Sequence, residues 1–384
     1  MALLLEMLVG AIALLWVVQG TRAFRGMSKL PPLADVTPLP DADCPRVSIL
    51  VAARDEAAKL PEALPTLLAQ DYPRYEVIVV DDRSRDATRE ILDEFSRADK
   101  KLKVLHLTDL PNGWLGKPHA LATAYGEATG DWLVFADADV RFAPDLLRRA
   151  LALVLQRRWD HLTLLGTMDL TGFWEKAVIS YFGLGFTLGV EPWRASDPRS
   201  RRYLGMGYFQ LLRRAAYEAI GTHRRLAMEI VDDMKLGKLV KLGGFRSGVA
   251  AANDRIRMRW YEGLRNIVRG TTKNVFAFDD YSIRRVVERV LAVLAVSLLP
   301  FVALLLSSGL TRILAAVSVI IGVALHAWCA RTARVSWFYG FTHPIGACIL
   351  CYLLLRGTVV TVRRGGVVWR DTFYSLKDLR KGLV

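Results

Sequence analysis

The sequence is poor in cysteine and lacks two common nucleotide-binding motifs. Its four cysteines, Cys44, Cys329, Cys348 and Cys351, lie far apart or in apolar runs. This distribution supports neither a zinc site nor a disulfide scaffold. No G-x-G-x-x-G follows the first short apolar run and no P-loop occurs, so a dinucleotide-binding fold is disfavoured.

Acidic residues are scarce in the last quarter of the chain. Residues 281–384 contain 13 Lys or Arg against three Asp or Glu, whereas residues 44–280 contain 36 against 31. The formal net charge of +14 therefore lies mainly in the most apolar part of the chain. A nucleic-acid-binding protein would carry its cations on the folded polar part, so the sequence predicts no nucleic-acid partner. Cations that flank apolar runs are typical of membrane anchoring.

Long uncharged runs predict contact with a lipid bilayer. Three of them have about the length that spans a bilayer as a helix, namely residues 290–311, 313–330 and 335–355. Residues 2–20 are apolar apart from Glu6 and lack the basic start and cleavage site of a signal peptide, which predicts a retained anchor. Arg22, Arg25 and Lys29 follow this anchor, so the next domain is expected to be cytoplasmic.

The number of apolar runs conflicts with the charge of the tail. If all three C-terminal runs cross the bilayer, residues 356–384 lie outside, yet they carry seven Lys or Arg. Only Arg312 stands in the loop after the first run. Because cytoplasmic segments are enriched in cations, we expect one run to be re-entrant or interfacial. Residues 335–355 are the expected one, because His343-Pro344 interrupts them.

Short apolar runs alternate with segments of helical periodicity between residues 46 and 136. The predicted strands are residues 46–53, 75–80, 103–107 and 132–136, and the predicted helices are residues 55–69, 86–95 and 118–128. This alternation predicts an α/β fold with a mostly parallel sheet and helices on both faces. The expected organisation is an N-terminal anchor (1–21), a linker (22–45), the α/β domain (46–280), membrane segments (281–362) and a basic tail (363–384).

Acidic residues follow three of the predicted strands. Arg54-Asp55-Glu56 follows the first, Asp81-Asp82 ends the second, and Asp137-x-Asp139 follows the fourth. In a parallel sheet such ends meet at one edge, where ligands bind. Two carboxylates on one short turn suit Mg²⁺ or Mn²⁺, and these ions in turn bind a diphosphate. The pattern predicts a nucleotide diphosphate held by carboxylates and metal, and the alternative is a solvated turn with unrelated acids.

These segments resemble a known family. VSILVAARDEAAKL, YEVIVVDDRSRDAT and GDWLVFADADV are similar to the nucleotide-binding half of family 2 glycosyltransferases, which have the GT-A fold. The resemblance covers residues 46–274. The pentapeptide Gly-Trp-Leu-Gly-Lys at residues 113–117 resembles a narrower group of membrane enzymes that glycosylate lipids, including hopanoid-associated, carotenoid-type and ceramide-type enzymes. The resemblance implies a GT-A nucleotide-diphospho-sugar transferase domain, with transmembrane helices before and after it.

Seven residues stand at donor-side positions of the family motifs. The resemblance implies nucleotide contacts for Arg54, Glu56, Asp81, Asp82, Lys117 and Asp137. It implies that Asp137 and Asp139 together hold a divalent cation, Mg²⁺ or Mn²⁺, with the diphosphate of the donor.

A later acidic pair is the expected source of the catalytic base. An inverting transfer needs a base at the acceptor hydroxyl and no covalent nucleophile. The resemblance places this carboxylate in Val231-Asp232-Asp233, with Asp233 as the base and Asp232 in support. The alternative is that both are first-turn helix acids stabilised by the helix dipole.

Two positions depart from the family patterns. Members that extend polysaccharides carry Q-x-x-R-W, but here Ile256 replaces the Gln that precedes Arg259 and Trp260. We still expect Arg259 and Trp260 to contact diphosphate or acceptor. Asp55 stands where Asn is usual, which affects details of nucleotide contact rather than the fold. Gly207 is expected to let the backbone approach the sugar closely.

The sequence therefore predicts a membrane-bound inverting glycosyltransferase, specifically a hexosyltransferase. The expected donor is a nucleotide-sugar, most simply a UDP-sugar, and the expected acceptor is a membrane lipid. The expected location is the cell inner membrane, with the catalytic domain in the cytoplasm. A polysaccharide synthase is disfavoured by the incomplete Q-x-x-R-W, and a sugar nucleotidyltransferase by the missing Gly-rich phosphate loop. A non-catalytic scaffold is disfavoured because all the acidic positions are present.

Overall fold

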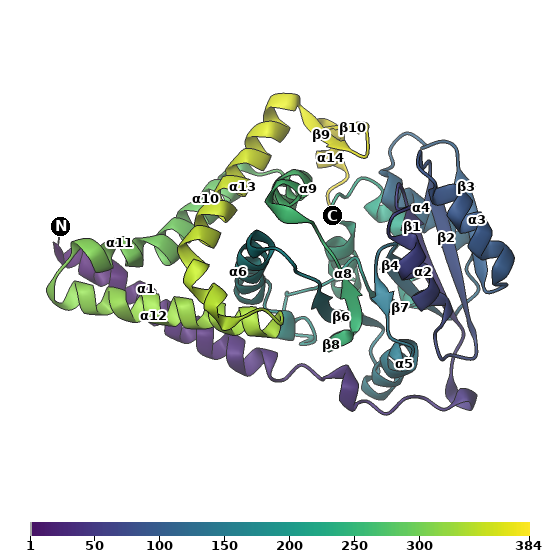
Figure 1. The fold of residues 1–384 in the computed structure, drawn as a ribbon, viewed down its shortest axis with the longest axis horizontal. Helices are drawn as coiled ribbons and strands as arrows, with labels where there is room; N and C mark the ends of the chain where they lie inside the picture. The colour runs from purple at the N-terminus through teal and green to yellow at the C-terminus, as the bar shows by residue number, and fades with distance from the viewer. Residues whose placement is uncertain (1) are drawn as a thin grey trace. The chain divides into compact units, whose positions relative to one another are not determined.

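The computed structural model describes residues 2–384, which form two compact units (Figure 1). The sheet domain consists of Leu30–Asp169, Pro192–Arg259 and Lys381–Val384. The helical unit consists of residues 2–29, Leu170–Glu191 and Trp260–Arg380. Each unit is thus assembled from three separate stretches of chain.

The sheet domain contains an eight-stranded sheet with the order β3-β2-β1-β4-β7-β6-β8-β5. The strands are β1 Val47–Ala53, β2 Tyr75–Asp82, β3 Leu102–Leu107, β4 Trp132–Asp137, β5 Arg141–Phe142, β6 His161–Met168, β7 Gln210–Arg213 and β8 Ser247–Met258. β1 pairs in parallel with β2 and β4, β2 with β3, and β6 with β8. β7 is antiparallel to β4 and β6, and β5 is antiparallel to β8. The predicted α/β fold is confirmed, including its first four strands.

Side chains alternate between two cores along β1. Ile49 and Val51 pack into one core with the helices Leu60–Leu68, Thr88–Ala98 and Leu146–Arg157. Leu50 packs into the other core with the helices Gly116–Glu127 and Asp232–Leu242. This period of two follows from the pleat of the strand, and burial of each such side chain contributes about 1.5–3 kcal/mol. The helices of the domain are α2 Leu60–Leu68, α3 Thr88–Ala98, α4 Gly116–Glu127, α5 Leu146–Arg157, α7 Arg214–Ala219 and α8 Asp232–Leu242.

The helical unit consists of helices and one small hairpin. Its elements are α1 Ala2–Met27, α6 Phe173–Val190, α9 Gly263–Phe278, α10 Ile283–Val293, the π-helical η5 Leu294–Leu298, α11 Leu299–Leu306, α12 Gly309–Thr332, the 3-10 helix η6 Trp337–Thr342, α13 His343–Arg364, β9 Gly366–Trp369, β10 Thr372–Ser375 and α14 Leu376–Lys381. All four cysteines of the chain are free thiols. Cys348 and Cys351 have C-x-x-C spacing within α13, with Cys348 exposed and Cys351 buried.

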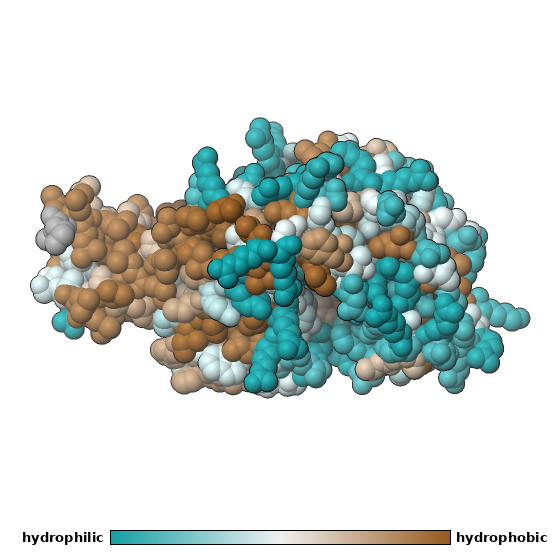
Figure 2. Space-filling view, turned by 90° about the horizontal axis from the view of Figure 1, so that it is seen from above, coloured by the Kyte–Doolittle hydropathy of each residue, from teal (hydrophilic) through white to brown (hydrophobic). Residues whose placement is uncertain are grey.

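Four helical segments among the described residues are long and apolar enough to cross a membrane. They are Leu3–Met27, Ile283–Leu306, Gly309–Thr332 and Trp337–Arg364. Large apolar side chains on them face outward, since Leu306 is 82% exposed and Ile320 is 66% exposed. Figure 2 shows this surface in brown around the end formed by α1, α11 and α12. An apolar surface of this extent is unfavourable in water and is compatible with lipid.

A π-turn and a proline bend the segment formed by α10, η5 and α11. Pro300 stands in the first turn of α11 and has no N–H. It therefore cannot donate the usual helical hydrogen bond to the carbonyl of Val296, four residues earlier. Trp16 of α1 supplies the donor, because its Nε1 donates to the Val296 carbonyl at 3.1 Å. A side chain of the N-terminal helix therefore satisfies the backbone at the bend.

Two membrane segments differ from their predicted ranges. The first C-terminal helix ends at Leu306, because the chain is extended before Gly309, where φ is +59° and α12 begins. α13 begins at His343 and carries Pro344 in its first turn. The pair stands at the boundary between the 3-10 helix η6 and α13, so residues 335–355 do not form one continuous α-helix.

Candidate active site

The register of the parallel strands brings the acidic strand ends to one edge of the sheet. Asp81 of β2 lies opposite Ala53 of β1, and Asp137 of β4 lies opposite Ala52. Arg54 follows β1 at the same level, because parallel strands in register end together. The structure thus joins the first, second and fourth strand ends in one site.

Asp81 is buried and belongs to a row of three side chains. His106 Nδ1 of β3 lies 2.9 Å from Asp81, and its Nε2 lies 2.9 Å from Asp93 of α3. Burial raises the pKa of Asp81, but hydrogen bonds from Ser84 and His106 outweigh burial and lower that pKa. Burial lowers the pKa of His106, but Asp93 and Asp81 outweigh it and raise that pKa. His106 was not predicted from the sequence, although its place near the end of the third predicted strand was a usable signal.

Asp82 is buried between two arginines and a helix start. Arg83 donates to both of its oxygens, at 2.7 and 3.1 Å, and Arg54 Nη1 lies 3.7 Å from Oδ2. A Cβ placed on Gly116 would lie 2.2 Å from Asp82 Oδ2, so any other residue at the start of α4 would displace the Asp82 carboxylate. The positive end of that helix dipole also favours a carboxylate. This contact explains the second glycine of Gly-Trp-Leu-Gly-Lys.

Side chains of the loop after β2 and of α3 hold the backbone after β1. Asp55 has φ +54°, a region that Asp and Asn tolerate best among residues with side chains. Its N–H donates to Ser84 Oγ at 3.0 Å, and its Oδ1 accepts from the N–H of Arg85 at 2.8 Å. An Asn offers the same acceptor oxygen, so Asp at this position preserves the loop. The N–H of Glu56 donates to Thr88 Oγ1 at 2.8 Å, which fixes the next residue.

Each carboxylate of Asp137-x-Asp139 contacts a lysine. Lys117 Nζ of α4 lies 2.6 Å from Asp137 Oδ1, and Lys59 Nζ lies 2.6 Å from Asp139 Oδ2. No group of three metal-ligating side chains comes together among the residues that the structure describes. The two carboxylates nevertheless fit Mg²⁺ or Mn²⁺, because Mg²⁺ commonly takes one or two protein carboxylates and completes its shell with phosphate and water oxygens.

Lys117 lies among three carboxylates. Burial lowers the pKa of its ammonium group, but Asp137, Asp232 and Asp233 outweigh burial and raise that pKa. Lys117 therefore remains a cation at the pH of a cell. A fixed cation beside Asp137 is suited to a ligand that carries several negative charges.

Asp233 stands in the first turn of α8 and accepts two backbone hydrogen bonds. Gly207 N–H donates to its Oδ2 at 2.9 Å, and Met234 N–H donates to its Oδ1 at 2.7 Å. Burial raises the pKa of Asp233, and the charge of Asp137 adds to this, while Lys117 and the two N–H groups act in the opposite direction. The net result is a raised pKa, which makes Asp233 a stronger base than an exposed aspartate. Asp232, the residue before it, is buried.

Gly207 is the point where the donor-side and base-side residues meet. A Cβ placed there would lie 2.9 Å from Asp137 Oδ2, 3.2 Å from Lys117 Nζ and 3.3 Å from Asp233 Oδ2. A Cβ on Gly205 would lie 1.9 Å from the carbonyl oxygen of Asp233. These two glycines let the chain before β7 pass against α8, which places Asp233 beside Asp137.

The structure does not gather every predicted residue into this cluster. Trp260 belongs to the helical unit, where its ring centroid lies 4.9 Å from Tyr261 and 6.4 Å from Phe182. Arg259 is the last residue of the second stretch of chain in the sheet domain. Ile256 is buried in the core at the position where the processive motif has Gln.

Residues 48–162 match the sequence model of glycosyl transferase family 2. That segment contains β1 to β4 and the three acidic strand ends described above. This match confirms, for residues 48–162, the similarity to family 2 glycosyltransferases that the sequence motifs predict.

Two curated proteins are similar to this chain in sequence. The chain is 26% identical over 236 residues to the 4,4'-diaponeurosporenoate glycosyltransferase of Staphylococcus haemolyticus, covering 60% of each protein. It is 28% identical over 275 residues to the beta-monoglucosyldiacylglycerol synthase of a Synechocystis species, covering 65% of this chain and 55% of the relative. The chain thus spans no more than about 60% of the length of either relative.

A solved structure confirms the fold. The chain is similar to a mannosyltransferase from Pyrobaculum calidifontis in complex with GDP-Man and Mn²⁺, with a TM-score of 0.58. The similarity covers 91% of this chain and 99% of that one, at 21% sequence identity. At this identity the likeness concerns the fold alone, and it confirms the predicted GT-A-like architecture.

Proposed function

We propose that the chain is a membrane-bound, metal-dependent, inverting glycosyltransferase that moves a sugar from a nucleotide-sugar, with a UDP-sugar as the expected donor, to a membrane lipid. The observation that carries this proposal is the convergence of Asp137, Lys117 and Asp233 on Gly207. Binding of a donor diphosphate requires Asp137 and Lys117, and deprotonation of an acceptor hydroxyl requires Asp233. The named activities of both relatives support a lipid acceptor.

On the donor side, each residue has a role that its contacts suit. Asp81 and Asp82, with Arg54 beside them, offer fixed acceptors and a donor to a base and ribose. Asp137 and Asp139 would hold Mg²⁺ or Mn²⁺, which when bound supplies charge neutralisation at the departing diphosphate. Lys117 contributes a second positive charge at the same place, without any change of protonation state. Glu56 is proposed to contact the nucleotide, and its carboxylate lies 3.8 Å from Lys59 Nζ, which contacts Asp139.

On the acceptor side, Asp233 takes the proton of the attacking hydroxyl. Its raised pKa matches this task, because a general base works best when its pKa approaches the ambient pH. The two N–H donors fix the carboxylate, so one geometry is presented to the acceptor. Asp232 supports this arrangement electrostatically by keeping Lys117 charged. Arg259 and Trp260 are proposed to contact diphosphate or acceptor.

The proposed membrane topology rests on the contacts that Val384 makes within the sheet domain. Val384 N–H donates to Glu229 at 2.7 Å, and Lys235 Nζ donates to the Val384 carbonyl at 3.0 Å, all within the sheet domain. The tail and the sheet domain therefore share one side of any membrane, so the chain crosses an even number of times between β8 and the tail. α13 is the proposed re-entrant or interfacial segment, because Arg356 in its middle donates to Thr272 of α9. Cations follow α1, and cytoplasmic segments are enriched in cations. The proposed side for the sheet domain and the tail is therefore the cytoplasm, with the protein in the inner membrane of the cell.

A transfer assay on the full chain tests the proposal. The protein in lipid nanodiscs is incubated with Mn²⁺ and a panel of UDP-sugars and GDP-sugars, and nucleotide release and glycosylated lipid are measured by mass spectrometry. We expect nucleoside diphosphate release matched by one sugar per lipid, abolished by Asp139→Ala. Glu94→Gln, an exposed carboxylate of α3, is the control. A ladder of products would indicate a polysaccharide synthase, and pyrophosphate release would indicate a nucleotidyltransferase.

A further inference from the structure

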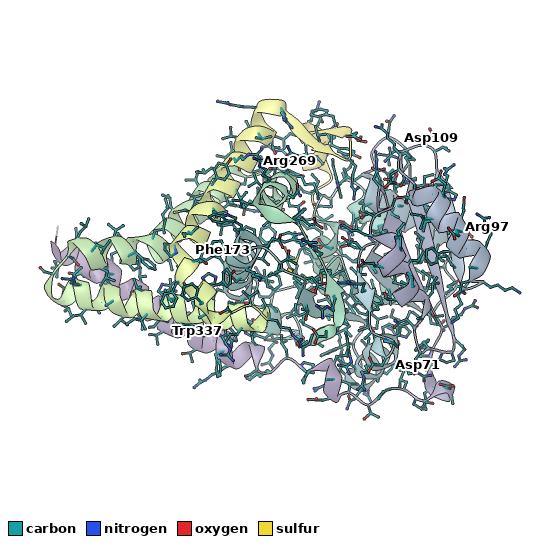
Figure 3. All side chains as sticks on the ribbon, viewed as in Figure 1. Asp71, Arg97, Asp109, Phe173, Arg269 and Trp337 are labelled. Atoms are coloured by element: carbon teal, nitrogen blue, oxygen red, sulfur yellow. The ribbon has the colours of Figure 1, made fainter. Side chains whose placement is uncertain are left out.

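A basic cavity of about 290 Å³ lies between α9, α13 and β9 of the helical unit. Ten residues line it, and the six with polar side chains are Arg269, Thr272, Lys273, Arg356, Thr361 and Arg364. Four of these are cations, and none of the ten is a carboxylate. Figure 3 labels Arg269 on α9, beside α13 and the β9-β10 hairpin. None of the lining residues belongs to the donor or base site described above.

Close packing of the two helices shapes this cavity. A Cβ on Gly357 of α13 would lie 2.3 Å from Val275 Cγ2 of α9, so glycine allows the helices to approach here. Arg356, the preceding residue, donates to Thr272 Oγ1, which fixes its guanidinium at the cavity wall. α13 then ends at Gly365 with φ +67°, and the chain turns directly into β9. The four cations are therefore presented by two packed helices, and β9 lines the cavity with Gly366, Val367 and Val368.

Four cations around one cavity without a lining carboxylate repel one another. That repulsion falls when an anion enters, and arginine pairs best with planar or tetrahedral oxyanions through two parallel hydrogen bonds. The threonine hydroxyls add donors for the same oxygens. The volume is near the lower end of the range of about 300–1,000 Å³ for small-ligand sites, so a phosphate and its first substituent fit.

The cavity also stands at the level where a lipid headgroup would lie. It lies along Arg356–Arg364, the C-terminal part of α13 and of the candidate span Trp337–Arg364. Trp369 of β9 lies beside it, with Lys273 Nζ 4.1 Å from the ring centroid. Tryptophan and cations together mark the membrane interface, and basic pockets between such helices bind anionic headgroups.

We propose that this cavity binds the phosphate group of an anionic ligand, in the first place the headgroup phosphate of a membrane lipid. The site would couple the helical unit to anionic lipid in the adjacent leaflet. This inference does not depend on the transfer reaction, and it holds whether or not the bound lipid is an acceptor.

The test uses the full chain and two pairs of matched variants. Arg269→Gln and Arg364→Gln remove cavity cations, while Arg265→Gln and Arg363→Gln remove exposed arginines of the same helices that do not line the cavity. Each protein is reconstituted in nanodiscs of phosphatidylcholine with phosphatidylglycerol, and the lipid retained after transfer to detergent is counted by native mass spectrometry. We expect each cavity variant to bind phosphatidylglycerol about tenfold more weakly and each control to bind like the unchanged protein.

Two further arms separate the sources of phosphate. In nanodiscs of phosphatidylcholine alone, the amount of retained lipid should be the same for the unchanged protein and for the Arg269→Gln and Arg364→Gln variants. Inorganic phosphate should raise the melting temperature of the unchanged protein less than phosphatidylglycerol does, and not at all in the double variant Arg269→Gln/Arg364→Gln. A larger effect of inorganic phosphate than of lipid would overturn the lipid assignment. Equal lipid retention in cavity and control variants would overturn the site itself.

Discussion

Asp233 accepts a hydrogen bond from the backbone N–H of Gly207 at 2.9 Å, so a residue without a side chain orients the proposed base. A Cβ there would also lie 2.9 Å from Asp137 Oδ2. We expect Gly207→Ala to lower kcat by about tenfold or more, because a misplacement of about 1 Å in a catalytic group has effects of that order or larger. The measurement is a steady-state transfer assay together with the melting temperature.

Gly126→Ala is the matched control for that substitution. Gly126 lies in α4, and no atom would approach a Cβ there within 4 Å. Alanine in a helix is more favourable than glycine by about 1 kcal/mol, so this variant should keep full activity and melt slightly higher. If Gly207→Ala and Gly126→Ala lose activity equally, crowding of Asp137 and Asp233 does not explain the loss in Gly207→Ala.

Asp233→Asn should stop transfer while leaving donor binding intact. The amide oxygen can still accept from Gly207 or from Met234, so one of the two backbone hydrogen bonds is kept, but the side chain no longer takes a proton. We expect kcat to fall by about a hundredfold or more, with the dissociation constant for the nucleotide changed less than about threefold. Calorimetric titration with UDP and Mn²⁺ gives the second value. Full turnover by this variant would remove Asp233 from the role of base.

The rate should depend on pH through the same carboxylate. The pKa of Asp233 is raised, and the base must be ionised to act. The value of kcat/KM should therefore rise with pH through that raised pKa and reach a plateau above it. A pH profile of the unchanged enzyme checks this, and a rate that is flat far into the acid range would contradict it.

His106 should make stability depend on pH in a defined direction. Its pKa is raised in the folded chain, so its contribution is fully present below the unfolded value near 6.5 and is lost as pH rises through the folded pKa. His106→Asn should remove this dependence. The measurement is the melting temperature across neutral pH, where the unchanged protein should lose stability relative to the variant as pH rises.

The bend at Pro300 provides a test within the helical unit. Trp16→Phe leaves the Val296 carbonyl without its side-chain donor and should lower the free energy of unfolding by about 1–2 kcal/mol. Pro300→Ala restores a backbone N–H, so the loss caused by Trp16→Phe should be smaller in that background. Thermal unfolding in detergent of the four proteins gives the coupling, and strictly additive losses would contradict it.

Much of the sheet domain could be predicted from the sequence because short apolar strands and acidic strand ends leave a strong local pattern. Asp81 and Asp137 follow directly from such strands, and parallel register then places them together. Lys117 and Asp233 required the family resemblance, because nothing local indicates that α4 and α8 meet. Gly207 was named for close backbone approach, but its contact with Asp233 depends on tertiary packing.

Other features could not be derived locally. His106 joins Asp81 to Asp93 only because β3 lies beside β2, a pairing that hydropathy does not specify. Pro344 was expected to interrupt the run 335–355, but the sequence did not show that a 3-10 helix precedes it and that α13 begins at His343. The basic cavity was not predicted, because Arg269 and Arg364 are far apart in sequence and meet through the crossing of α9 and α13.

The discontinuity of the sheet domain determines how a soluble fragment would have to be made. β5 pairs with β8, which is synthesised much later, and α6 leaves the ribosome between β6 and β7. Trimming the chain before β8 would expose the edge of β6, and unpaired edges promote aggregation. Trimming only the two ends would leave the apolar α6 without α13, which it meets where Gly346 faces Tyr181. A crystallisable catalytic fragment would therefore require replacing residues 170–191 with a short polar linker, as well as removing the terminal membrane helices.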